Sequence, residues 1–104
     1  MHPAVARSPV AQLDEDIQRT RAAIKPTKEA WIDCTMHEAV RLAKSSATIE
    51  QVIQAVYASC SEEERRFSLA LIQQLGGAGP GVMYKIKNEV ARQHLTRLII
   101  KARR

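Results

Sequence analysis

The 104 residues are enough for one domain with a modest core, and 45% hydrophobic with 26% charged residues is the balance of an ordinary globular protein. Because Trp, Tyr and Phe together number four, the core has to be mainly aliphatic, which favours packed helices over a β-sandwich or β-barrel. The formal net charge of +5 is concentrated near the C-terminus, where residues 82–104 carry seven basic groups against one acidic group.

The first half of the sequence predicts two helices. Residues 1–8 are expected to form a flexible arm, followed by a single helical domain over 9–104. Ser8 before a proline is a typical helix start, and apolar residues then follow at helical spacing: Val10, Leu13, Ile17 and Ile24. Pro26 is expected to end or kink this helix. A second helix, from about residue 27 to 44, carries apolar residues on two faces and is the candidate for the central helix.

The second half predicts three more helices. Thr48 and Gln51 match a capping box, and the apolar residues after them have the clearest amphipathic spacing in the chain. Another helix begins at Ser61 and stops at Gly76. The last helix starts near Pro80, and its apolar positions change phase. Either the helix breaks near Asn88 or it packs against different neighbours along its length, and we expect a bend.

These patterns predict an all-α fold of four to five helices in a small orthogonal or bundle-like arrangement. The second and third helices are expected to form an antiparallel hairpin about a turn near residue 47. In a hairpin that turns near residue 47, the numbers of two facing residues add up to roughly 94. Cys34 and Cys60 satisfy this condition, so they are expected to lie at the same level.

The two cysteines have three possible states. Cys34 and Cys60 can form a disulfide if their Cα atoms approach within about 7 Å. They can equally be packed as thiols in a reducing cytosol. A reactive Cys60 is the weakest alternative: it precedes a helix start, but the three glutamates after it oppose a thiolate.

Motifs for catalysis or cofactor binding are not found. The cysteines and histidines lack metal-ligand spacing, and "HEAVR" at 37–41 ends in Arg41 where a zinc motif needs histidine. The glycine-rich stretch 76–81 lacks the lysine and hydroxyl residue of a phosphate loop. We therefore expect no enzyme, no metal, no cofactor and no small-molecule substrate.

The basic C-terminal helix is the best candidate for an exposed functional surface. Its polar half contains five cations, which are Arg92, Arg97, Lys101, Arg103 and Arg104. Such a helix suits an acidic protein partner, nucleic-acid phosphates or an anionic membrane surface, and it is equally typical of a core helix with a solvated face. The scarcity of aromatics argues against specific base recognition.

The pattern Trp31-x-x-Cys34, the stretch 55–60 and the Glu/Arg start of the next helix resemble a loose group of small uncharacterised bacterial helical proteins. The resemblance covers about residues 30–104 and implies a helical fold and a cysteine pair, without an activity. Many members of that group follow a secretion signal.

We expect a non-enzymatic interaction or structural protein that binds a protein partner or itself. The alternative is sequence-independent nucleic-acid binding through the C-terminal helix. No stretch reaches the roughly 18 apolar residues of a membrane span, and the start lacks a signal-peptide pattern. The expected location is cytoplasmic, or periplasmic or secreted if a leader was removed.

Overall fold

The computed structural model describes residues 8–104, and every regular element within them is helical, which confirms the all-α class. The elements follow in chain order: α1 (Pro9–Leu42), α2 (Ile49–Ser59), α3 (Ser61–Leu75), a 3₁₀ turn (Gly76–Ala78), α4 (Gly79–Lys85), a π segment (Ile86–Ala91) and α5 (Arg92–Ala102). Of the predicted N-terminal arm, residues 1–7 lie outside the described part, and Ser8 caps α1 by accepting a hydrogen bond from the Ala11 amide.

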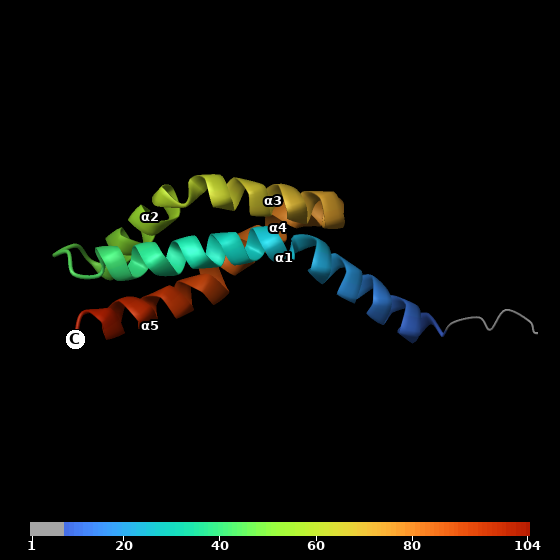
Figure 1. Ribbon diagram of the computed structural model, residues 1–104, viewed down its shortest axis with the longest axis horizontal. Helices are drawn as coiled ribbons and strands as arrows, with labels where there is room; N and C mark the ends of the chain where they lie inside the picture. Colours follow the sequence, from blue (N-terminus) through green and yellow to red (C-terminus); the bar gives the residue numbers. More distant parts are fainter. Residues whose placement is uncertain (1–7) are drawn as a thin grey trace, which may run out of the picture.

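The described chain forms three long helical segments, and the expectation of four to five separate helices is wrong. The segments are α1, then α2 with α3, then α4 with the π segment and α5. Pro26 does not end a helix, because α1 continues through it. An interior proline removes one hydrogen bond and bends a helix, and Figure 1 shows α1 changing direction between its blue and green parts. The Thr27 hydroxyl donates to the Ile24 carbonyl near this bend.

The second half of α1 is the central element. Across the turn at residues 43–48, α2 runs back along α1, and α3 continues in the same general direction, so both lie against one side of it (Figure 1). Thr48 and Gln51 form the capping box that starts α2. The chain then reverses at the 3₁₀ turn, and α4 to α5 return along another side of α1.

Two glycines make this reversal possible. Gly76 has φ +61°, a left-handed conformation that residues with a side chain rarely adopt. Gly79 is buried, and a Cβ atom placed there would lie 2.9 Å from the backbone of Ile72. Helices α3 and α4 can therefore approach this closely only because residue 79 has no side chain.

The core has two clusters along α1. One joins the end of α1 to α2 and α5, and its buried members are Ala39, Ala43, Val52, Ile53, Val56, Leu95 and Ile99. The other lies around the joint between α2 and α3, and its buried members are Trp31, Cys60, Phe67, Leu71 and Met83. Each cluster receives residues from all three helical segments, so the segments are packed as one body.

The π segment explains the phase change of the last helix. Met83 is buried before it, and Leu95 and Ile99 are buried after it, while Val90 within it is exposed. A π turn contains more residues than an α turn, so it rotates the apolar face of the following helix. The helix near Asn88 is therefore neither broken nor merely bent. It stays continuous, and the wider π turn accommodates one more residue than an α turn would.

Candidate functional site

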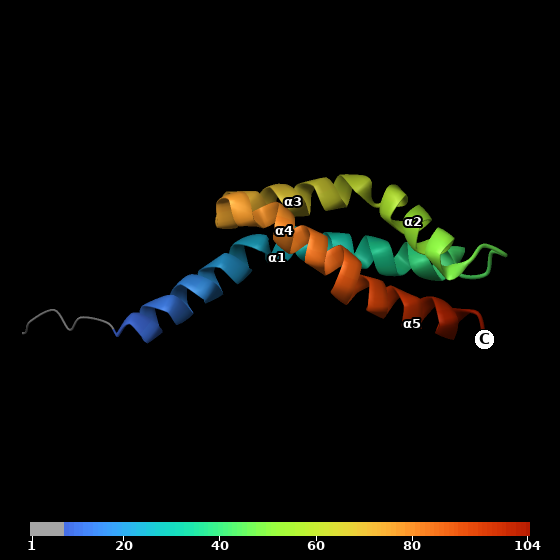
Figure 2. The same ribbon diagram turned by 180° about the vertical axis from the view of Figure 1, so that it is seen from behind.

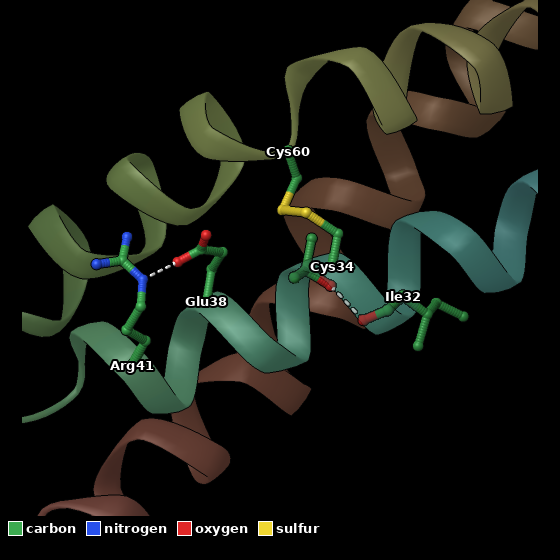
Figure 3. Close-up of a disulfide and its surroundings, with 6 residues drawn as sticks. Ile32, Cys34, Glu38, Arg41 and Cys60 are labelled. Atoms are coloured by element: carbon green, nitrogen blue, oxygen red, sulfur yellow. Dashed lines mark hydrogen bonds and ion pairs between the residues drawn. A yellow bond between two sulfur atoms is a disulfide. The ribbon is translucent and has the colours of Figure 1, made fainter.

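The two cysteines form a disulfide that joins α1 to the joint between α2 and α3. The Sγ atoms of Cys34 and Cys60 are 2.09 Å apart and their Cα atoms 5.9 Å apart. Figure 3 shows the bridge between the two backbones, with the ion pair of Glu38 and Arg41 further along α1. Cys60 is fully buried. Of the three states that the sequence left open, the structure has the disulfide, and its place in the core gives it a structural role.

An aromatic cluster lies beside the disulfide. Trp31 stacks on Tyr57 with ring centroids 6.0 Å apart and contacts Phe67 at 5.8 Å. The Tyr57 hydroxyl donates a hydrogen bond to the main-chain oxygen of Lys87. Burial, with a smaller contribution from the negative charge of Glu64, raises the pKa of Tyr57 to about 12. The phenol is thus held in its neutral, hydrogen-bonded form.

Two of the five predicted C-terminal contact residues are engaged within the molecule. Arg92 forms an ion pair with Glu50 at the start of α2. Arg103 donates hydrogen bonds to main-chain oxygens of the turn at 43–48, reaching Ala43 at 2.5 Å and Ala47 at 2.6 Å. These two arginines hold α5 against the hairpin, so their first role is structural.

The other three predicted contact residues remain together at the surface. Arg97 and Lys101 are exposed on α5 and Arg104 is exposed just beyond its end, and the three line a shallow hollow together with Ile100. The spacing of four residues places Arg97 and Lys101 on one side of the helix, and Arg104 lies beside them in the same hollow. The stripe is a cationic surface of three charges, smaller than the five that the sequence predicted.

An apolar groove of about 390 Å³ lies between α1, α3 and the C-terminal segment. Its apolar lining includes Ile32 and Met36 from α1, Phe67 from α3 and Val90 from the π segment. Lys28 and His94 add polar groups. No pattern in the sequence predicted this groove, because it depends on the rotated face of the π segment.

The first part of α1 is an exposed amphipathic helix. Residues 9–25, here named the α1 arm, extend away from the other helices in both views (Figures 1 and 2). Its apolar side chains are largely uncovered: Val10 is 76% exposed, Leu13 59% and Ile17 40%. The sequence predicted only that these residues follow helical spacing, and the structure leaves Val10, Leu13 and Ile17 without a partner among residues 8–104.

Within residues 8–104, the structure brings no three histidine, cysteine or acidic side chains close enough to hold a metal ion. No helix in this range is long and apolar enough to span a bilayer. No family model, curated protein or solved structure matches the chain. The resemblance to small bacterial helical proteins thus stays a prediction.

Proposed function

We propose that the protein is a non-enzymatic helical interaction protein whose contact surface is the apolar face of the α1 arm. The observation that carries this proposal is the exposure of Val10, Leu13 and Ile17 on a helix that leaves the body. Large apolar side chains that share one helix face and contact water mark an interaction site. Helix-to-helix packing is the common way in which such a face is covered.

The body supports this role as a rigid anchor. The same helix that forms the arm continues into the core, where Trp31 is only 1% exposed, and the disulfide at Cys34 fixes α1 to the other segments. The arm is therefore positioned by a cross-linked core.

A photoreactive phenylalanine analogue at Leu13 tests the proposal. We expect illumination of the protein in its native cells to give a covalent adduct with a protein. The matched control is the analogue at Ala22, which is exposed on the opposite side of the arm and should give none. Absence of any adduct from Leu13, or equal adducts from both positions, would overturn the proposal.

Nucleic-acid binding is the second candidate, supported by the exposed stripe of Arg97, Lys101 and Arg104. Three phosphate contacts imply a log–log salt dependence of about −2.7 in a gel-shift assay. Replacing the three residues with alanine should abolish binding at low salt. If the wild-type protein shows no shift at low salt, this candidate fails.

We propose an oxidising compartment as the location, in preference to the cytoplasm. The support is the disulfide, because structural disulfides are rare in reducing compartments. Quantifying free thiols in protein trapped with an alkylating reagent directly in cells tests this: two alkylated cysteines would place the protein in a reducing compartment.

A further inference from the structure

The apolar face of the α1 arm has the spacing of a coiled-coil seam. Its positions follow one another by three and four residues in alternation, as in the a and d positions of a heptad: Val10, Leu13, Ile17, Thr20, Ile24 and Thr27. The next position in this series, Trp31, is already in the core of the body. The seam is thus fully covered at Trp31 and partly covered at Ile24, which packs against the core cluster of Trp31, whereas Val10, Leu13 and Ile17 are exposed.

The charges of the arm change sign along its length. Three acidic residues occupy 14–16, whereas the basic residues Arg19, Arg21 and Lys25 follow. When two identical arms lie antiparallel, the acidic part of each faces the basic part of the other, and this happens twice. A parallel pair in register would align the two acidic stretches with each other and the two basic stretches with each other, and its flanking contact would join Asp16 to Arg21 of the second copy instead.

The heptad fixes a register for such an antiparallel pair. Leu13 then packs against the part of Ile24 that the second copy's own body leaves uncovered, and Ile17 packs against Thr20 of the second copy. In antiparallel coiled coils the e positions face each other across the seam, which brings Asp14 opposite Arg21 of the second copy. Asp14 and Arg21 are both exposed, although Asp14 also accepts a 3.5 Å hydrogen bond from Gln18 in its own helix.

We propose that the partner of the α1 arm is the same arm of a second copy, and that the two arms pair antiparallel. The two bodies, each cross-linked by its own Cys34–Cys60 disulfide, then lie at opposite ends of the pair. This inference rests on the proposed function and names its partner. The arm is about 26 Å long, at a rise of about 1.5 Å per residue. So short a seam, with threonine in two of its positions, forms a reversible dimer whose population depends on protein concentration.

Sedimentation equilibrium over a range of concentrations measures this dimer. Leu13→Glu places a charge in the seam, and we expect it to weaken association at least about tenfold. Ala22→Glu is the matched control, since it adds the same charge on the far side of the arm. Both variants should keep the wild-type thermal unfolding midpoint of the body. A wild-type protein that is monomeric at every concentration would overturn the inference.

A charge swap tests the orientation. Asp14→Arg or Arg21→Asp alone puts like charges opposite each other and should weaken the dimer. The double variant D14R/R21D reverses both partners of each pair and should restore it. In a parallel pair residue 21 faces Asp16 instead, so the double variant would remain weak, and that result would overturn the antiparallel register.

Engineered cysteines test the same register directly. A mixture of Ile17→Cys and Thr20→Cys proteins should form the mixed disulfide dimer on mild oxidation, while Ile17→Cys alone should cross-link poorly. Efficient cross-linking of Ile17→Cys with itself would show parallel pairing and overturn the proposal.

The photo-cross-link at Leu13 separates this inference from the broader function. An adduct with the mass of two copies of this chain supports both. An adduct with a different protein only, from a protein that sediments as a monomer, keeps the proposed function and overturns self-pairing.

Discussion

The hydroxyl group of Tyr57 in α2 donates a 2.7 Å hydrogen bond to the main-chain oxygen of Lys87 in the π segment, 30 residues further along the chain. The ammonium group of Lys87 lies 4.8 Å from the centre of the same ring and 2.9 Å from a carboxylate oxygen of Glu64 in α3. The π segment also uses the Asn88 side chain, which donates to the Tyr84 carbonyl. Side chains thus satisfy main-chain oxygens around this irregular turn and fix it to α2 and α3.

Tyr57→Phe removes the hydroxyl and leaves the Lys87 carbonyl without this donor. We expect a loss of about 1–3 kcal/mol in the free energy of unfolding, because a polar group in a partly buried site then lacks its partner. Urea unfolding followed by circular dichroism measures it. Tyr84→Phe is the control, since Tyr84 is exposed. Equal effects of the two substitutions would contradict this role of the hydrogen bond.

The raised pKa of Tyr57 predicts a loss of stability at alkaline pH. The phenol titrates near 10.0 in the unfolded chain and at about 12 in the folded one, so the folded state holds its proton more tightly. The protonated phenol therefore stabilises the folded state fully below pH 10.0, and this stabilisation decreases as the pH rises towards about 12. Tyrosinate absorbance of the Tyr84→Phe variant, in which Tyr57 is the only tyrosine, reports the titration. A midpoint near 10.0 in the folded protein would be inconsistent with the buried phenol.

Gly79→Ala should destabilise the protein by about 1–3 kcal/mol, because the added Cβ would lie 2.9 Å from the backbone of Ile72. Helices α3 and α4 would have to separate. Gly81→Ala is the matched control in the same helix: nothing lies within 4 Å of its Cβ position, and alanine favours the helix. Thermal unfolding measures the midpoint temperature of both variants. A midpoint of Gly79→Ala at or above that of Gly81→Ala would show that α3 and α4 do not need a glycine at position 79.

The disulfide should contribute substantially to stability. Cys34 and Cys60 are separated by 26 residues, and in the chain-entropy model closing such a loop stabilises the folded state by about 3.5 kcal/mol. The double variant C34A/C60A should unfold at a correspondingly lower urea concentration, and added reductant should leave it unaffected. The wild-type protein, denatured without reductant, should show no free thiols; two free thiols would rule the disulfide out.

Arg103 and Arg104 are adjacent arginines with different surroundings. Both are exposed, but the Arg103 side chain donates to the carbonyl oxygens of Ala43, Ser45 and Ala47, whereas the Arg104 side chain donates no hydrogen bond within residues 8–104. We expect Arg103→Ala to cost about 1–3 kcal/mol, because hydrogen bonds from a charged donor are strong, and Arg104→Ala to be nearly neutral. Hydrogen exchange at residues 43–48 should accelerate in the first variant alone. Unchanged exchange in Arg103→Ala would show that the turn does not depend on this side chain.

The local patterns of the sequence predicted the helix starts at Ser8 and Thr48, because a cap depends on residues three apart. The sequence also showed that the apolar positions of the last helix change phase before Leu95. A π turn and a bend produce the same change, so the sequence could not distinguish them. The course of α1 through Pro26 was not predictable, since a proline can kink a helix or end it.

Which side chains are exposed at the surface depends on contacts between residues far apart in the chain, and local sequence patterns do not show these contacts. An apolar stripe shows that a helix has an inner face, but not whether other helices cover it. The helical spacing of Val10, Leu13 and Ile17 therefore did not predict that these side chains are exposed. Likewise, the partners of Arg92 and Arg103 are about forty to sixty residues away in the chain. The sequence alone therefore could not distinguish these two arginines from the three cations that stay at the surface.

The disulfide also determines how the protein carries mechanical tension. If the α1 arm and the end of α5 were pulled apart, the shortest covalent path would run from Cys34 through the sulfur bridge to Cys60. The second half of α1 beyond Cys34, the turn at 43–48 and α2 lie outside that path. Force would reach them only through non-covalent contacts, such as the hydrogen bonds that Arg103 donates to the turn, so the hairpin's own backbone would not be stretched once these contacts break.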